Sequence, residues 1–135
     1  MIDLIPSIFP FTIEYLSKSI RTGELLPSEL IRLCLTQIKK FNPLLNSFIT
    51  IRSEEEIFES AVKCDNQVKQ NNHLDPLHGI PYSIKDMIHV KRLKFTAGSK
   101  FYPSYFSTTT ASIVKILNKK GAILIGTNNL NEFNT

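Results

Sequence analysis

The 135-residue sequence lacks several features that would assign it to a class at once. No apolar run approaches the ~18–20 residues that a membrane-spanning helix needs. Residues 1–11 have neither the basic start of a secretory signal nor the arginine-rich character of a transit peptide. Internal repeats and low-complexity tracts are also absent. With 42% apolar and 21% charged residues, the chain has the composition of one globular domain, and we expect a cytoplasmic protein without a membrane anchor.

Metal and nucleotide motifs are missing as well. The two cysteines, Cys34 and Cys64, fall on predicted helical faces without metal-motif spacing, so we interpret them as small core residues. The three histidines, His73, His78 and His89, form no cluster with cysteines or carboxylates, and we expect no metal site. Neither a Walker loop nor a dinucleotide-binding glycine motif is present, so no cofactor is expected.

The formal net charge of +4 is mildly basic. The tightest basic cluster, Lys91, Arg92 and Lys94, lies in a predicted loop. A solvated loop is its more ordinary interpretation, and contact with an anionic partner is the alternative. Because the other basic residues are interspersed with acidic ones, the sequence contains no direct nucleic-acid motif.

Apolar residues at helical spacing predict two helices near the start of the chain. The first begins after Thr12, a capping residue, and ends at Gly23. The second begins at Pro27, which suits a first helical turn, and is expected to end at Asn42-Pro43. The side chains predicted to be buried are Ile13, Leu16 and Ile20 in the first helix and Leu30, Leu33, Cys34, Ile38 and Phe41 in the second.

A short β-prone run over residues 46–51 separates these helices from a third. Ser53 and Glu56 form a capping box at the start of the third helix. Its predicted buried face consists of Ile57, Ala61, Cys64 and Val68. Residues 67–75 are polar and predict a surface linker.

The remainder of the sequence predicts a β-α-β unit. Its parts are a strand over residues 80–84, an aperiodic loop over 86–107, a helix over 108–120 closed by Gly121, and an apolar strand over 122–126. We expect Ile113, Ile116 and Leu117 of the helix to be buried, and residues 129–132 to start another helix. Such a unit implies parallel strands with a right-handed crossover. The predicted fold class is therefore α/β, with N-terminal helices followed by a mixed β-sheet flanked by helices.

Lys85 is the candidate catalytic residue because it stands where the first strand of this unit ends. Asn128 stands at the end of the next strand, and open α/β sheets place their sites at these ends. A lysine acts as a base when desolvation or nearby positive charge makes its ammonium more acidic. The alternative is that Lys85 simply pairs with Asp86 or another acid. Ser99 does not lie in the strand–turn–helix elbow of a G-x-S-x-G hydrolase.

Three blocks of sequence, in the same order, resemble the N-terminal part of the amidase signature family. They lie at residues 22–50, 77–99 and 121–133, so the resemblance extends along nearly the whole length of the chain. The middle block contains the specific pattern H-G-I-P-x-x-x-K-D, from His78 to Asp86, and then Thr96-Ala97-Gly98-Ser99. The resemblance implies that residues 1–135 form the N-terminal part of a single domain with an incomplete amidase-signature fold. Residues 1–75 would be its helical region, and 76–135 the start of its α/β core.

Enzymes of this family resemble one another in hydrolysing carboxylic amide C–N bonds with a Ser–cisSer–Lys triad. The resemblance implies that Lys85 is the base that takes a proton from the bridging serine, which activates the nucleophilic serine. The Gly/Ser-rich segments that carry both serines in the family are not among these 135 residues. Because nucleophilic attack and oxyanion stabilisation depend on those segments, we expect this chain alone to be inactive.

The resemblance leaves the substrate and the subfamily open. A small amide is implied, and the subfamily is either a general amidase or the glutamine-hydrolysing A subunit of glutamyl-tRNA(Gln) amidotransferase. The second case implies the other components of the amidotransferase as partners and tRNA as an indirect one. A different class of function is a non-catalytic product that serves in binding or scaffolding.

The sequence departs from the family pattern at four positions. Arg92 stands where a glycine is frequent, and Phe95 stands where a threonine is frequent. Thr127 replaces the usual lysine, and Asn131 replaces the usual aspartate. Loss of the glycine could change the path of the loop.

Overall fold

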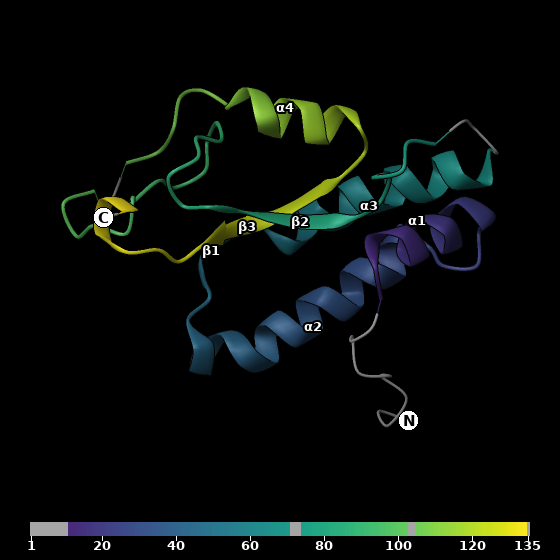
Figure 1. Cartoon of the computed structure of the whole chain (residues 1–135), viewed down its shortest axis with the longest axis horizontal. Helices are drawn as coiled ribbons and strands as arrows, with labels where there is room; N and C mark the ends of the chain where they lie inside the picture. Colours follow the sequence, from purple (N-terminus) through teal and green to yellow (C-terminus); the bar gives the residue numbers. More distant parts are fainter. Residues whose placement is uncertain (1–10, 71–73, 103–104, 135) are drawn as a thin grey trace.

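The computed structural model describes residues 11–70, 74–102 and 105–134 and has the predicted α/β class. A three-stranded sheet lies between α4 on one side and the N-terminal helices on the other (Figure 1). The elements in chain order are α1 (Ile13–Thr22), α2 (Pro27–Leu45), β1 (Phe48–Ile51), α3 (Glu54–Lys69), β2 (Pro81–Lys85), α4 (Ser112–Lys119), β3 (Ile123–Asn128) and the 3₁₀ turn η1 (Glu132–Asn134).

The sheet is mixed and has the strand order β1-β3-β2. β2 and β3 are parallel, as predicted, and their register places Lys85 beside Asn128. β1 pairs with β3 in the antiparallel direction, so the region predicted as helical over residues 1–75 also contributes an edge strand. β3 is the central strand, and its residues 123–127 are all buried, as its apolar sequence predicts.

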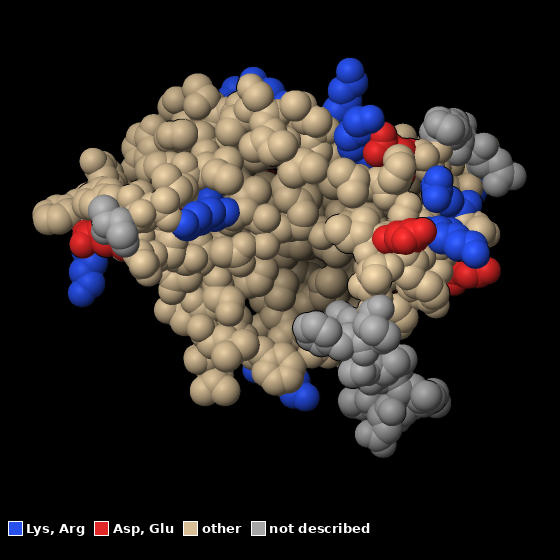
Figure 2. Space-filling view, viewed as in Figure 1, with Lys and Arg blue, Asp and Glu red and all other residues tan. Residues whose placement is uncertain are grey.

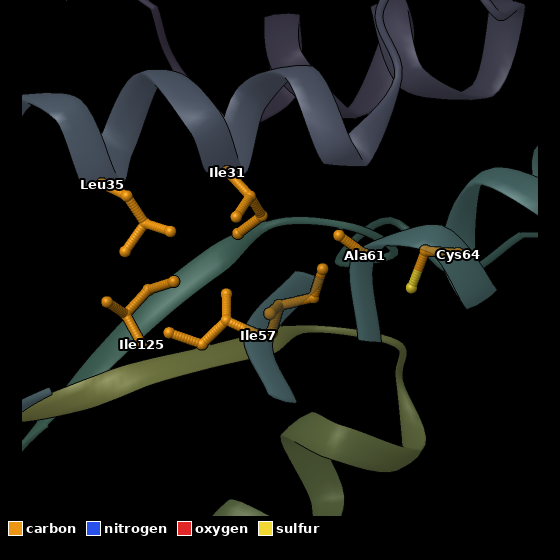
Figure 3. Close-up of a cluster of buried hydrophobic side chains, with 7 residues drawn as sticks. Ile31, Leu35, Ile57, Ala61, Cys64 and Ile125 are labelled. Atoms are coloured by element: carbon orange, nitrogen blue, oxygen red, sulfur yellow. The ribbon is translucent and has the colours of Figure 1, made fainter. Parts of the chain in front are cut away.

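The main core lies between the sheet and the helices α2 and α3 (Figure 3). The predicted face of α3 is confirmed, since Ile57, Ala61, Cys64 and Val68 are all buried. The stripe predicted for α2 is partly wrong. Leu30 is buried, but the other two core residues are Ile31 and Leu35, while Leu33 and Phe41 are exposed. The buried face is rotated toward Ile31 and Leu35 because those two side chains pack against α3 and β3.

The predicted caps of α1 are present. Thr12 Oγ1 accepts the N–H of Tyr15 at 3.1 Å, and Gly23 closes α1 with a φ of 77°. Of the capping box predicted for α3, the Ser53 half forms, while the Glu56 carboxylate pairs with Arg52. Ser53 Oγ accepts the N–H of Glu56 at 3.2 Å. Ile13, predicted to be buried, is exposed. The linker predicted over residues 67–75 begins later than expected because α3 continues to Lys69, and residues 71–73 lie outside the described part.

The predicted end of α2 at Asn42-Pro43 is wrong. The helix continues through Pro43 to Leu45. A proline lacks only its own N–H, and the helix closes beyond it because Asn46 N–H reaches the carbonyl of Asn42 at 2.7 Å. Asn46 then adopts a φ of 50°, a left-handed conformation that asparagine tolerates.

The helix predicted over residues 108–120 is shorter than expected and buries less. Only Val114 of α4 is buried, where it packs over Ile84 and Leu124, while Leu117 is half-buried. Ile113 is 51% exposed and Ile116 is 53% exposed, so the prediction that both are buried is wrong. Burial of these two would need a second packing surface, and the described residues offer only the sheet.

The segment after β3 also differs from its prediction. In place of a new helix, the chain forms the single turn η1, in which Phe133 has a non-helical φ of 50°.

None of the helices in the described ranges is long and apolar enough to cross a membrane.

Candidate active site

Lys85 lies at the carboxyl end of β2, as the sequence predicts, and its side chain is exposed. Its Nζ donates a hydrogen bond to Oδ1 of Asn134, on the turn that follows β3. None of the ion pairs in the described part of the chain includes Lys85, so the alternative in which it pairs with Asp86 or another acid does not hold there. The ammonium group therefore lies on the surface with an amide oxygen as its partner.

Asp86 faces away from Lys85 and is 1% exposed. Its carboxylate accepts hydrogen bonds from Thr96, one from the backbone N–H at 3.0 Å and one from the Oγ1 hydroxyl. Its own backbone joins two segments, since its N–H donates to Asn128 O at 3.1 Å and its carbonyl accepts from Ala97 N–H at 2.9 Å. Asp86 thus ties the long loop to the end of both parallel strands.

The turn Thr96-Ala97-Gly98-Ser99 extends this connection to the segment after β3. The N–H of Phe133 donates to the carbonyl of Ala97 at 2.8 Å, and Ser99 Oγ donates to Glu132 Oε1 at 2.7 Å. A Cβ atom on Gly98 would lie 2.8 Å from the carbonyl oxygen of Leu130, and Gly98 has a φ of 67°. Only glycine meets both conditions. The turn therefore fixes the segment that carries Asn134 to Lys85.

Two buried polar atoms beside this network lack hydrogen-bond partners. Within the described residues, Asp86 Oδ1 and Thr127 Oγ1 are both buried and have no hydrogen-bond partner. Thr127 is in register with Ile84, two residues before Asp86, so alternation along β2 places Thr127 and Asp86 on the same face. A buried carboxylate oxygen without a partner costs free energy.

His78 has a structural position that the sequence did not reveal. It is 5% exposed, and its Nε2 lies 3.1 Å from the carbonyl oxygen of Cys64 in α3. Because a carbonyl only accepts, Nε2 carries the proton and donates. The next residue, Gly79, has a φ of 73°, and a Cβ there would lie 2.4 Å from Pro27 Cγ. The H-G-I-P segment therefore anchors the start of β2 against α2 and α3.

The cysteines and the other possible metal ligands form no second reactive centre in the described part of the chain. Burial raises the pKa of the Cys34 and Cys64 thiols, so neither is activated as a nucleophile. Among the residues that the structure describes, no group of three His, Cys, Asp or Glu side chains could hold a metal ion. His73 lies outside the described residues.

Comparison with known proteins identifies the family. A sequence model of the family described as Amidase matches residues 29–135. The chain belongs to the amidase family.

Amidase-family proteins of known structure share the fold. The peptide amidase of Stenotrophomonas maltophilia is 27% identical, with a TM-score of 0.83 over 93% of this chain and 26% of its own. An amidase family protein of Bacillus anthracis is 29% identical, with a TM-score of 0.82 over 93% of this chain and 25% of its own.

Several curated relatives carry the same name. The A subunit of the glutamyl-tRNA(Gln) amidotransferase of Prochlorococcus marinus is 39% identical over 126 residues, which are 90% of this chain and 25% of that protein. The mitochondrial protein of the same name from Rattus norvegicus is 34% identical over 122 residues, which are 90% of this chain and 23% of that protein. The chain thus spans about a quarter of the length of the amidase-family relatives that it matches.

Two departures from the amidase pattern are accommodated in the long loop. Arg92, where a glycine is frequent, has a φ of 67° and so keeps the left-handed conformation that glycine favours. Its N–H donates to the carbonyl of Ser107 at 2.8 Å. Phe95, where a threonine is frequent, stacks on His89 with ring centroids 4.3 Å apart. The loop is therefore held by its own backbone and aromatic contacts.

Proposed function

We propose that this chain is the N-terminal part of an amidase-signature hydrolase that cleaves carboxylic amide C–N bonds. In this proposal Lys85 is the base of a Ser–cisSer–Lys triad, and the rest of the family fold supplies both serines. Residues 1–75 are its helical region and residues 76–135 the start of its α/β core. The observation that supports it best is the position of Lys85, exposed and free of carboxylate partners in the described structure, at the carboxyl end of the parallel pair β2–β3.

Lys85 must meet two conditions to act as a general base. Its amine must approach the bridging serine, and it must lose its own proton before it can accept another. The amide partner Asn134 leaves the charge of Lys85 uncompensated, whereas a carboxylate partner would favour the ammonium form. Desolvation by the remainder of the fold would then favour the neutral amine that a general base requires.

We further propose glutamine as the substrate, hydrolysed to supply ammonia for tRNA-dependent amidation. The support is the shared name of the curated relatives, which are glutamyl-tRNA(Gln) amidotransferase A subunits from bacteria and from mitochondria. On this proposal the partners are the other amidotransferase subunits, with tRNA as an indirect partner, and the protein works in the cytoplasm.

The first test measures ammonia release from glutamine and from simple amides. The 135-residue chain alone should release none, because the triad serines and the oxyanion-stabilising backbone are not in it. Measurable turnover by this chain that Lys85→Ala abolishes would contradict the proposal.

The second test fuses this chain to the remaining three quarters of the Prochlorococcus marinus relative, in place of the matching segment. The fusion should hydrolyse glutamine, and Lys85→Ala should abolish that activity. Lys100→Ala, at another exposed lysine of the same half, is the matched control and should leave it unchanged. A folded fusion that is inactive in every form would favour a binding or scaffolding role.

A further inference from the structure

A groove opens at the amino end of β3, away from Lys85, because β1 is shorter than its neighbour. β1 ends at Ile51 beside Gly126, so the first residues of β3 extend past it. Arg52 partly covers this exposed stretch, with its backbone N–H 2.9 Å from Ile125 O and its Nη1 3.2 Å from Leu124 O. Two adjoining cavities of about 570 Å³ and 280 Å³ share Arg52, Asn118 and Leu124 in their walls. They form one depression between α3 and α4, called here the α3–α4 groove.

The α3–α4 groove concentrates the positive charge of the protein. Its walls carry six cationic residues and two carboxylates, an excess of four that equals the formal net charge of the whole chain. The cationic residues are Arg52, Lys63, Lys91, Arg92, Lys119 and Lys120, and the carboxylates are Glu56 and Asp75. By contrast, few charged side chains lie across the middle of the face shown in Figure 2.

Four of these cations remain uncompensated. Arg52 pairs with Glu56 at 3.3 Å, and Lys120 pairs with Asp75 at 2.7 Å. The other four, Lys63, Lys91, Arg92 and Lys119, are exposed and form no ion pair with any residue that the structure describes. The loop cations Lys91 and Arg92, interpreted from sequence as solvated, therefore join cations from two helices. Such a cluster raises the local concentration of a polyanion.

The other wall residues indicate which polyanion suits the groove. They include hydrogen-bonding side chains, Ser60, Gln67, Thr110 and Asn118, but no phenylalanine, tyrosine or tryptophan. Base stacking relies mainly on aromatic side chains, and protein–protein hot spots are enriched in tryptophan and tyrosine as well as arginine. Phosphate contacts need only cations and hydrogen-bond donors, and they carry no sequence information.

We propose that the α3–α4 groove binds the phosphate backbone of RNA without sequence preference. This site is separate from Lys85 and does not depend on the proposed amide chemistry. Because each neutralised phosphate of a single strand releases about 0.7 counterion, four free cations predict a slope of log Kd against log salt of about 3.

The test is fluorescence anisotropy of a labelled single-stranded RNA oligonucleotide titrated with the 135-residue chain at several salt concentrations. The unaltered chain should bind at low salt with the stated slope. The double variant Lys63→Glu and Lys119→Glu should bind at least ten-fold more weakly. Lys18→Glu with Lys40→Glu changes the net charge equally, at exposed positions on α1 and α2, and should weaken binding by less than three-fold.

Three results would overturn this proposal. One is the absence of binding at low salt by a chain whose circular dichroism shows it to be folded. Another is equal weakening by the two double variants, which would mean general charge attraction. The third is competition by polyglutamate as effective as that by unlabelled RNA, which would point to an acidic protein in place of RNA.

Discussion

The two sides of the β-sheet are packed very differently. On one side, α2 and α3 bury a continuous set of side chains against β3, including Ile31, Ile57 and Ile125 (Figure 3). On the other side, α4 buries a single residue, Val114, and leaves Ile113 and Ile116 more than half exposed. The first side, called here the closed side, is covered by α2 and α3. The second has a smaller apolar cluster, in which Ile84, Val114 and Leu124 are buried and residues of the long loop are partly buried.

This difference separates what stabilises the fold from what positions the candidate base. The side with α2 and α3 needs no contribution from the loop after β2. The geometry at Lys85 depends on a few hydrogen bonds and one glycine in that loop. Substitutions on the α2–α3 side should therefore cause the larger losses of stability. Substitutions in the loop should also change the surroundings of Lys85.

The largest effect should come from Ile57→Ala on the closed side. Removing this fully buried side chain should lower the free energy of unfolding by about 2–5 kcal/mol. Ile116→Ala is the matched control on α4 and should change it by less than about 0.5 kcal/mol. Urea denaturation of both variants measures the difference. Equal losses would mean that α4 is as well covered as α3.

Gly98→Ala should come next, and Gly23→Ala is its control. Both glycines have positive φ, so each alanine should cost about 1–2 kcal/mol of backbone strain. At Gly98 the new Cβ would also meet the carbonyl of Leu130, which should add about 1–3 kcal/mol, whereas Gly23 has open space. Thermal unfolding compares them, and similar losses would argue against the close approach of the two loops.

Thr96→Val tests the hydroxyl that bonds to buried Asp86. Loss of this donor should cost about 1–3 kcal/mol, because a buried carboxylate loses a partner. Thr96→Ser keeps the hydroxyl and should retain most of the stability. NMR of the Asn134 side-chain amide should shift in the valine variant and not in the serine one. An unchanged Asn134 signal in both variants would show that the Asp86–Thr96 hydrogen bond does not position the partner of Lys85.

The smallest effect concerns pH, on the side of α4. Burial raises the pKa of Tyr82 to about 12, and its hydroxyl donates to Asn118 Oδ1 at 2.8 Å. The unfolded chain loses this proton near its ordinary pKa of ~10, so the folded state binds the proton more tightly between the two values. Stability should therefore fall as pH rises from 10 to 12, and Tyr82→Phe should reduce that fall. Urea midpoints across this range measure it, and identical slopes for both proteins would contradict the assignment.

Local sequence patterns predicted most of the elements and the parallel pairing of β2 and β3. They failed where the outcome depends on distant residues. The apolar spacing of Ile113 and Ile116 gives a helical stripe, but no pattern says whether another surface lies against it. The asparagine and proline at residues 42 and 43 are a common stop signal, which the hydrogen bond from Asn46 overrides.

The candidate site was predictable only in part, and for a similar reason. A strand-end lysine and the H-G-I-P-x-x-x-K-D pattern indicated Lys85. The contacts that position its surroundings, Asp86 with Thr96 and Ala97 with Phe133, join residues far apart in the chain. The amide partner Asn134 depends on η1, where a helix was expected.

The most direct test of Lys85 as the base is Lys85→Arg in the fusion with the Prochlorococcus marinus relative. Arginine keeps the positive charge and a similar reach, but its guanidinium does not give up a proton near neutral pH. We predict that kcat for glutamine hydrolysis falls by about 10²–10⁴-fold while KM stays within a few-fold, as expected when a general base is lost. A kcat within a few-fold of that of the unaltered fusion would show that Lys85 supplies only charge and would contradict its proposed role.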